Sequence, residues 1–532
     1  MQLCWPCQWL RRFILLFLIP FRRQLLTWNC LAALGVIVVL TYSVWRSHRN
    51  DRLEPPAAPS GIPFIGHLVG LVQYGAEYFN YLAARYQHYP IFSIDMRFGK
   101  VYIVTSPTLL QAIQRDRNLK FDPVLTITAE RVAGIRGRSL NLLREKQADG
   151  RTGNQAIVHA IHPVLTGSSL DRLNARMSRL LSPLVGELSQ SGKIDLYAWC
   201  THTITTASTD ASYGPLNPYK DRDIENAFWA MGNNLTPLLA NFLPQLFARK
   251  AWQGREKLVA AFVKYYSLDG HIEASDLTQA RYQALQSAGL SLTDIARHEA
   301  SMGLALLANT VPATFWILYD LYSRPELLSE IREELKRNVI RGSLEGKLLI
   351  SVSALRNTCP LFVSTYQEVL RFRSTSSPVR FAREDVVLNN KYFLKKGSII
   401  CIPGRPMSKH SMVWGTSAER FDPRRFIKRS EHNPRQTGGF MAFGVSPVIC
   451  PGRNFASSEI LAMVALVIMR VDLIPEGGVW REPHLNSLAI SSIMGPVKGE
   501  FNVRVGLREE FKEMTWDCEV EEGAGVFNLM VG

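Results

Sequence analysis

One cysteine, Cys450, lies in the segment that most constrains what this chain can fold into. Residues 443–452 read FGVSPVICPG, a loop of turn-forming residues, and an apolar stretch that predicts a helix, Ile460 to Val471, follows closely. A thiolate just before a helix N-terminus is stabilised by unpaired N–H groups and by the helix dipole, which lowers its pKa. Such a thiolate suits a haem iron, because it pushes electron density onto the metal. The alternative is a structural cysteine in a turn.

The composition indicates one large, mainly helical domain. The 532 residues are 47% apolar and 20% charged, which is enough to bury a large core. Neither a linker rich in Pro, Ser and Gly nor an internal repeat interrupts residues 70–505. Helices are predicted at Leu170–Leu188, Ile224–Leu235, Ser301–Tyr322, Leu361–Arg373 and Ser457–Met469, and strands at Ile91–Thr105, Val386–Leu394, Ser398–Ile402 and Glu500–Val505. The predicted fold class is mainly α with small β-sheets.

An excess of positive charge narrows the choice of partners. Lys and Arg number 61 against 46 Asp and Glu, a difference of 15. The charge is dispersed and no nucleic-acid motif accompanies it, so we expect no nucleic acid, and instead a membrane surface or an acidic protein partner. The eight cysteines are scattered and predict no disulfide framework, which favours a reducing compartment for the main domain.

The N-terminal part of the chain predicts a single-pass membrane anchor. Leu25 to Trp45 carries no charge and is long enough to cross a bilayer as a helix. A basic segment that lies in the membrane interface, 1–24, precedes it, and a basic, proline-rich hinge, 46–66, follows. A second membrane contact is expected at Pro237–Trp252, where apolar residues mix with basic ones; an ordinary loop over the core is the alternative.

Three charged residues stand in a specific order before the cysteine loop. Glu368 and Arg371 are three residues apart, so they share one face of a predicted helix and can form an ion pair. Arg425 follows in a proline-anchored turn, and Cys450 comes soon after. The spacing of Glu368 and Arg371 alone says little, but the whole order at these distances is highly specific.

With these motifs the chain resembles the cytochrome P-450 family of haem-thiolate monooxygenases over roughly residues 55–507. The resemblance implies the cytochrome P-450 fold, here preceded by a transmembrane helix, with a haem-thiolate catalytic domain at 67–507 and an acidic C-terminal tail at 508–532 beyond it. It implies haem b as cofactor, with Cys450 as the axial thiolate ligand of the iron. The remaining cofactor-binding residues that it implies are Phe443, Gly452, Arg380 and a buried ion-pair triad of Glu368, Arg371 and Arg425.

A finer resemblance is to the branch with cholesterol 7α-hydroxylase, sterol 12α-hydroxylase and prostacyclin synthase. The segments that carry it are 308–316 (ANTVPATFW), 379–385 (VRFARED) and 449–453 (ICPGR). By this resemblance Arg380 reaches a haem propionate; a surface arginine is the alternative. Val448 stands where the family usually has a cation, and Ser446 where it has glycine. His159 and His162 are further candidates for the propionates, with structural histidines as the alternative.

The predicted central helix departs from the family pattern. Val311 and Pro312 occupy the places of the usual acid and threonine, and neither side chain can relay a proton. Because Pro312 has no N–H, the helix should kink and leave the carbonyl of Ala308 free over the haem. A water held by this carbonyl and by Asn309 would then supply the proton path; residues that merely line the pocket are the alternative. The candidate catalytic residues are Asn309, Thr310 and Thr314.

The predicted function is a membrane-bound monooxygenase that hydroxylates or oxidises a bulky hydrophobic molecule, steroid- or terpenoid-like, for example a secondary metabolite. The resemblance implies O2 as co-substrate, NADPH-cytochrome P-450 reductase as electron donor, and an endoplasmic reticulum membrane with the catalytic domain in the cytosol. Substrate contacts are expected at Phe121–Ile135, Leu238–Phe247, Leu304–Pro312 and Ser491–Met494. The alternatives are a haem-thiolate isomerase that needs neither O2 nor reductase, and a non-enzymatic haem sensor or scaffold.

Overall fold

The computed structural model describes residues 53–60, 66–75, 77–96, 99–147, 150–342, 346–427, 439–486, 492–521 and 523. The predicted anchor, 25–45, and the basic segment before it lie outside these residues. Among the described residues, one stretch, Leu292–Tyr322, is long and apolar enough to cross a membrane, and 78% of its apolar window is buried inside the protein. This stretch is the central core helix, which the structure divides in two.

Helices make up most of the fold, as predicted. The longer ones are α7 (Gly153–Val164), α8 (Gly167–Ser189), α9 (Leu196–Tyr213), α10 (Arg222–Gly232), α13 (Arg249–Ser267), α14 (Asp276–Ser287), α15 (Leu292–Leu307), α16 (Thr310–Tyr322), α17 (Pro325–Asn338), α19 (Pro360–Phe372) and α23 (Arg453–Arg470). Shorter ones are α2 (Gly66–Tyr74), α3 (Glu77–Arg85), α4 (Pro107–Arg115), α5 (Asp122–Ile127), η1 (Thr128–Val132), α6 (Gly137–Arg144), η2 (Pro218–Lys220), α11 (Leu235–Ala240), α12 (Pro244–Phe247), α18 (Val352–Asn357), α20 (Gly404–Ser408), α21 (Ser411–Trp414) and η3 (Glu509–Phe511).

The strands form small sheets. One sheet has the order β1-β2-β10-β7-β3, from β1 (Ile91–Met96), β2 (Gly99–Val104), β10 (Ile399–Cys401), β7 (Val379–Ala382) and β3 (Leu119–Lys120). A second joins β13 (Val471–Pro475), β14 (Asn502–Leu507) and β4 (Lys193–Asp195), and a third joins β15 (Thr515–Glu519), β6 (Lys347–Ser351) and β5 (Ile340–Gly342). Two further sheets have two strands each: β8 (Val386–Leu388) with β9 (Tyr392–Leu394), and β11 (Gly444–Val445) with β12 (Val448–Ile449).

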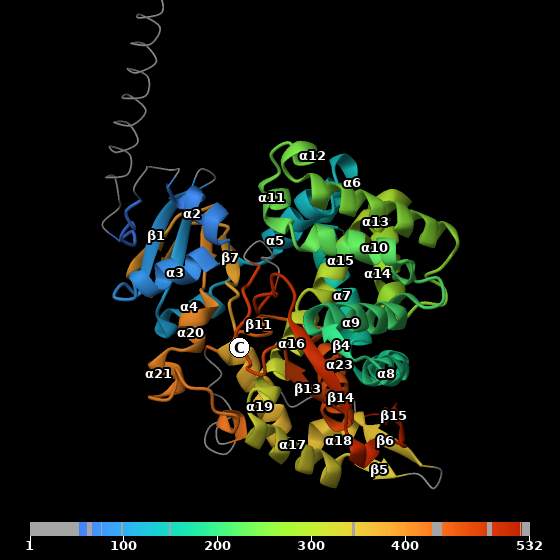
Figure 1. Cartoon of the computed structure of the whole chain (residues 1–532). Coiled ribbons are helices and arrows are strands. Elements are labelled where there is room, and N and C mark those ends of the chain that lie inside the picture. Colours follow the sequence, from blue (N-terminus) through green and yellow to red (C-terminus); the bar gives the residue numbers. More distant parts are fainter. Residues whose placement is uncertain are drawn as a thin grey trace, which may run out of the picture.

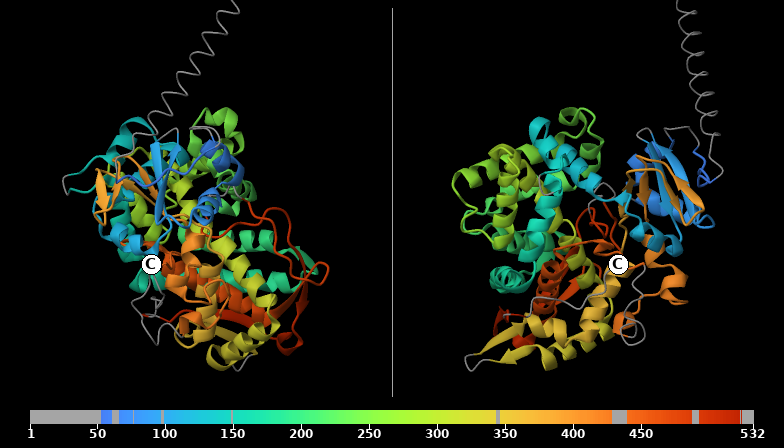
Figure 2. Two further views of the ribbon diagram at one scale, coloured as in Figure 1. Left: turned by 90° about the vertical axis from the view of Figure 1, so that its left-hand side faces the viewer. Right: turned by 180° about the vertical axis from the view of Figure 1, so that it is seen from behind.

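The five-stranded sheet and the helical bulk lie side by side. Figure 1 shows the sheet with α2, α3 and α4 in one lobe and the helices α6 to α15 in the other, and the views in Figure 2 agree. Helix α23 runs through the centre, where every residue from Ile460 to Met469 is buried. Helices α8 and α16 pack on it. The cysteine loop therefore leads directly into the innermost helix of the fold.

The proline-rich segment differs from the predicted hinge. The N–H of Ser93 in β1 donates to the Pro56 carbonyl, and the N–H of Ala58 donates to the Ser93 carbonyl, each at 2.8 Å. The buried carboxylate of Glu54 pairs with Lys100 at 2.5 Å. Residues 53–60 are thus part of the folded domain, held along an edge strand; 46–52 and 61–65 lie outside the described residues.

The C-terminal segment is also part of the fold, although the sequence assigned it no role. Strand β15 pairs in parallel with β6, and the hydroxyl of Ser182 in α8 donates to the Trp516 carbonyl. The Trp516 side chain is 6% exposed and packs edge-on against Phe511, with 5.2 Å between ring centroids. Residues 515–519 therefore complete a sheet, and the catalytic domain extends beyond the predicted boundary at 507.

Trp516→Ala is expected to destabilise the protein, because the substitution leaves a large cavity under β15. The expected loss is about 3–5 kcal/mol in the free energy of unfolding. Urea unfolding followed by circular dichroism measures it. Met514→Ala is the matched control, since Met514 is 40% exposed in the same segment. Equal stability of the two variants would contradict the packing of this strand.

A buried carboxyl in α23 gives stability a pH dependence. Glu459 is fully buried, accepts a hydrogen bond from the Ser208 hydroxyl at 2.6 Å, and its Oε2 contacts no donor among the described residues. Burial raises the pKa of Glu459 from its ordinary value of 4.5 to about 8. Between these two values the folded protein holds a proton that the unfolded chain releases, so stability falls as pH rises.

We expect Glu459→Gln to flatten this dependence. The wild-type protein should lose about 1.4 kcal/mol of unfolding free energy per pH unit from this group across the window from pH 4.5 to 8. The variant should lack that slope, while Glu476→Gln, at an exposed position, should keep it. Chemical unfolding at pH 5, 6.5 and 8 measures the slope. Parallel curves for wild type and Glu459→Gln would exclude a protonated Glu459.

Candidate active site

The loop that carries Cys450 is a tight hairpin. Gly444 has a positive φ of 101°, and a Cβ at this position would lie 2.6 Å from the Val448 carbonyl oxygen, so only glycine fits. The N–H of Cys450 donates to the carbonyl of Phe443 at 2.7 Å. Gly452 then begins α23 as its N-terminal cap residue. The hairpin and the helix together fix the cysteine at the start of α23, as the sequence predicts.

The pKa of the Cys450 thiol differs from the sequence prediction. Cys450 is solvent-accessible as a residue, yet desolvation by the surrounding protein raises the pKa of its thiol. The N–H groups of Gly452 and Arg453 and the charge of Arg453 act in the opposite direction but do not outweigh it. The prediction that the helix start lowers this pKa overall is therefore wrong for the thiol alone, because desolvation exceeds the effect of a few N–H groups.

The three charged residues before the loop meet in the core. Glu368 is fully buried in α19 and binds Arg371 through two contacts, Nε–Oε2 and Nη2–Oε1, each 2.7 Å. Arg425 approaches the same carboxylate with its Nε 3.1 Å from Oε2. The N–H of Asp422 donates to Glu368 Oε1 at 2.8 Å. One carboxylate thus ties α19 to the segment that leads toward the cysteine loop.

Arg380 supplies a buried positive charge beside that loop. Its side chain in β7 is 3% exposed and donates to the carbonyls of Val445, at 2.5 Å, and Val379, at 3.0 Å. Desolvation lowers its pKa, and no carboxylate among the described residues pairs with it. A buried cation without a neighbouring negative charge is energetically costly, so a bound anion would stabilise it. Because it contacts the cysteine hairpin, Arg380 fits a haem propionate, and the alternative of a surface arginine is excluded.

The other positions named for the propionates differ from Arg380 in exposure or in chemistry. His159 and His162 are both exposed on α7. Val448 is 37% exposed at the hairpin and offers no polar atom in its side chain. Of the propionate candidates named from the sequence, Arg380 is the one that the structure places next to the cysteine hairpin.

The central helix breaks near Pro312, as predicted. The Ala308 carbonyl, which loses its helical donor at the break, is nevertheless hydrogen-bonded. Helix α15 ends at Leu307 and α16 begins at Thr310. The hydroxyl of Ser492 donates to the Ala308 carbonyl at 2.6 Å, and the N–H of Ile493 donates to Asn309 Oδ1 at 2.8 Å. Protein donors from a distant loop thus already bond the Ala308 carbonyl and the Asn309 side-chain oxygen, the groups expected to hold the predicted water.

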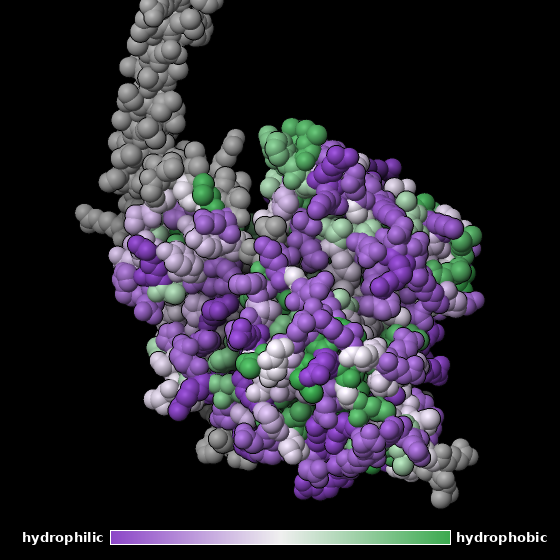
Figure 3. Space-filling view, viewed as in Figure 1, coloured by the Kyte–Doolittle hydropathy of each residue, from purple (hydrophilic) through white to green (hydrophobic). Residues whose placement is uncertain are grey.

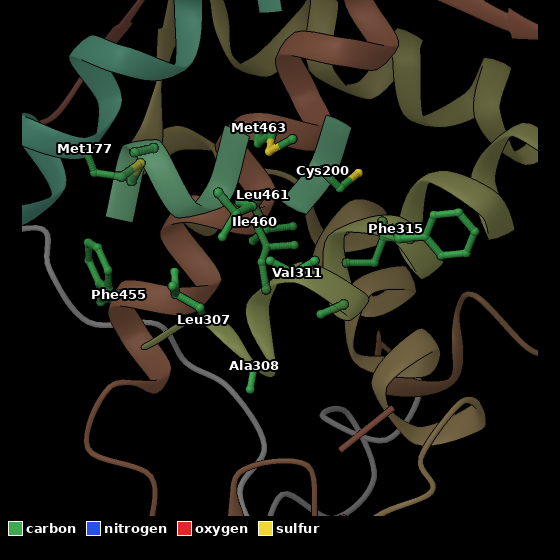
Figure 4. Packing of buried hydrophobic residues seen from close by; sticks show 14 of the residues in the cluster. Met177, Cys200, Leu307, Ala308, Val311, Phe315, Phe455, Ile460, Leu461 and Met463 are labelled. Carbon is green, nitrogen blue, oxygen red and sulfur yellow. The ribbon is translucent and has the colours of Figure 1, made fainter. Parts of the chain in front are cut away.

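The two threonines also bond within the helices. The hydroxyl of Thr310 donates to the Leu306 carbonyl at 3.1 Å, and that of Thr314 donates to the Thr310 carbonyl at 2.9 Å. Thr314 is fully buried. In Figure 4, Val311 faces α23 near Ile460, whereas Ala308 at the break points away from this cluster. Thr310 lies beside the break, while Thr314 lies one turn deeper in the core.

Several segments predicted to contact substrate lie close together. Arg131 in η1 donates to the Leu239 carbonyl of α11 at 3.0 Å, which joins two of them. The loop at 492–494 contacts the helix break, which joins two more. Sequence reasoning placed Ser492 within a substrate-contact segment but did not identify it as the partner of Ala308. The signal was indirect: Pro312 predicts an orphan carbonyl, and such a carbonyl needs a donor.

Comparison with known proteins identifies the family. The family model described as Cytochrome P-450 matches residues 55–502. The chain is 39% identical to cytochrome P-450 monooxygenase nodJ of Hypoxylon pulicicidum, over 94% of this chain and 98% of that protein. It is 24% identical to a cytochrome P-450 monooxygenase of Gibberella zeae, over 81% and 83% of the two chains. It is also 24% identical to the 5-beta-cholestane-3-alpha,7-alpha-diol 12-alpha-hydroxylase of Sus scrofa, over 79% and 86%.

The chain therefore belongs to the cytochrome P-450 family and is an oxidoreductase that holds haem through an axial cysteine thiolate. Cys450 is the cysteine at the start of the core helix, and Arg380 is the cation beside it. When bound, haem supplies the activation of O2, and the protein supplies orientation, exclusion of water and control of protons. A redox partner and a small-molecule substrate follow from the family, and the monooxygenase relatives do not favour the isomerase alternative.

Proposed function

We propose that this protein is a membrane-anchored monooxygenase that hydroxylates or oxidises a bulky hydrophobic substrate of steroid- or terpenoid-like shape. The observation that carries the proposal is the similarity, across most of both chains, to a sterol hydroxylase as well as to fungal monooxygenases. A rigid apolar polycycle also suits a site whose neighbouring segments are mainly apolar, since burial of such a molecule is favourable and its stiffness reduces the entropy lost on binding.

An exposed apolar surface supports the membrane part of the proposal. Phe242, Leu243, Leu246 and Phe247 are 65%, 54%, 72% and 63% exposed around α12. Figure 3 shows this group as a hydrophobic patch at one end of the molecule. Together with the uncharged stretch at 25–45 it favours attachment to a membrane by two contacts. We place the protein at the endoplasmic reticulum membrane with its catalytic domain in the cytosol.

The proposed electron donor is NADPH-cytochrome P-450 reductase. The dispersed positive charge of this chain suits an acidic protein partner. Electrons are needed because insertion of one oxygen atom of O2 into a C–H bond leaves the second atom to be reduced to water, which consumes two electrons and two protons.

Product analysis on membranes tests the function directly. Membranes with the full-length chain and the reductase are incubated with NADPH, O2 and a panel of steroids, terpenoids and indole terpenoids, and products are identified by mass spectrometry. We expect a product heavier than its substrate by one oxygen atom, and an ¹⁸O label when ¹⁸O2 is supplied. Membranes with Cys450→Ala are the control. A product formed without NADPH, and isomeric with its substrate, would instead establish the isomerase.

A further inference from the structure

The break between α15 and α16 leaves one buried carbonyl without a helical partner. The N–H of Ala308 still bonds Leu304 O at 3.3 Å, and the N–H of Ala313 bonds Asn309 O at 3.2 Å, so the helical pattern resumes on both sides. The donor that would serve the Ala308 carbonyl is the N–H of residue 312, which proline lacks. Ala308 is 4% exposed, and a buried carbonyl without a donor is costly.

A loop from the far end of the chain fills this need. Ser492 is 8% exposed, and its hydroxyl donates to the Ala308 carbonyl, while the next N–H, that of Ile493, donates to the Asn309 side chain. Two consecutive residues of the loop thus bind two consecutive residues of the break. The contact also fixes the Asn309 amide, because its oxygen is committed to the loop.

The loop itself is held from the opposite side. The N–H groups of Thr375 and Ser376 donate to the Ile493 carbonyl at 2.8 and 3.2 Å. The indole N–H of Trp316 donates to the Gly495 carbonyl at 3.0 Å. Both backbone polar groups of Ile493 are therefore used, and the position of Ser492 is set by three separate segments. Because each of these hydrogen bonds restricts the same short loop, together they hold Ser492 in one position.

Without Ser492, water is the available donor for the Ala308 carbonyl. A polar cavity with unsatisfied groups binds water, and a bound water can both donate and accept protons. Productive turnover places one oxygen atom of O2 in the substrate and reduces the other to water with two electrons from NADPH and two protons. Unproductive turnover uses the same two electrons and two protons to release hydrogen peroxide. Protons that a bound water passes to O2 without control would favour the second outcome.

We propose that Ser492 is a positioning residue for the oxygen reaction: its hydroxyl closes the Ala308 carbonyl against water and holds the helix break and Asn309 in one arrangement. Ser492 thereby limits proton delivery from the side of the central helix. The role depends on the hydroxyl and not on the size of the side chain, so threonine can replace serine and alanine cannot.

Reoxidation of the chemically reduced protein tests this role without a substrate or a reductase. Full-length protein, reduced with dithionite and freed of excess reductant, is mixed with O2, and stopped-flow absorbance follows the one-electron reoxidation, in which O2 takes up one electron and one proton and leaves as protonated superoxide. We expect Ser492→Ala to reoxidise about fivefold faster, which corresponds to the loss of one hydrogen bond. Ser492→Thr should stay within about twofold of wild type. The rate of Ser492→Ala should fall in D2O.

A matched control separates this effect from a general loss of packing. Ser182 is 7% exposed and its hydroxyl also donates to the carbonyl of a distant segment, that of Trp516. Ser182→Ala should therefore lose similar stability and leave the reoxidation rate unchanged. Haem content per chain and the CO spectrum should be the same in all variants. If Ser492→Ala does not retain haem, Ser492→Cys, whose thiol is a weak donor, carries the test.

Hydrogen exchange provides the second readout. Peptides that cover Ala308–Val311 and Ile493 should exchange faster in Ser492→Ala than in wild type or Ser492→Thr. Faster exchange together with faster reoxidation supports the proposal. A wild-type reoxidation rate in Ser492→Ala would overturn it, whether or not exchange changes. These measurements involve no substrate, so an error in the proposed substrate class would not affect them.

Discussion

Glu368→Ala is expected to yield a protein that holds little or no haem and is less stable by about 3–5 kcal/mol. The carboxylate of Glu368 is the common partner of Arg371 and Arg425, and all three side chains are buried. Removing it leaves two guanidinium groups in the core without a counter-charge. The segment that leads to the cysteine loop then loses its anchor on α19. Haem content per chain and the urea midpoint measure the two effects.

The control for this variant removes a carboxylate from an exposed ion pair. Lys193 and Glu476 contact each other at 2.9 Å, and their side chains are 53% and 64% exposed. Glu476→Ala should change stability by less than about 1 kcal/mol and leave haem content unchanged, because solvent screens an exposed pair. If Glu368→Ala keeps full haem content, the triad does not support the cofactor site.

Cys450→Ala is expected to abolish product formation, with a loss of about 1,000-fold or more, as for removal of an essential catalytic group. The substitution removes the thiolate, while the hairpin contact between the Cys450 N–H and the Phe443 carbonyl uses the backbone alone and should persist. The fold should therefore survive. Initial rates on reductase-containing membranes, divided by the amount of folded protein, measure the effect.

Cys518→Ala is the matched control for the loss of a thiol. Cys518 is partly exposed in β15, away from the cysteine loop, and its substitution should leave the rate within about twofold of wild type. Substantial turnover by Cys450→Ala would mean that another group holds the iron.

Local sequence patterns were sufficient to predict many of the helices and strands. The predicted helix at 170–188 is α8, and the predicted helix at 457–469 lies within α23, because long apolar periodicity identifies helices well. The strand pair at 91–105 is β1 and β2. The signal at 386–394 is a hairpin instead of one strand, since Asn389 and Asn390 adopt positive φ values of 50° and 54° and reverse the chain.

The parts that could not be predicted depend on distant contacts. The sequence identified Glu368, Arg371 and Arg425 through their order, and the structure brings them together. It could predict that Pro312 frees a carbonyl, but not that Ser492, some 180 residues away, would bind it. For the same reason neither the bridge from Ala57 to Ser93 in β1 nor the place of residues 515–519 in a sheet was recognised. Their pairing partners are strands elsewhere in the chain, and no local pattern reveals them.

The central claim, that Cys450 is the axial ligand of haem in this protein, is tested most directly by the absorbance of the reduced protein with CO. Thiolate ligation moves the Soret band of the CO complex far to the red of the position that a histidine-ligated haem shows. We predict this red-shifted band for the wild-type protein and for Cys518→Ala, and its absence from Cys450→Ala. A wild-type protein that binds haem but lacks the red-shifted band would contradict the account.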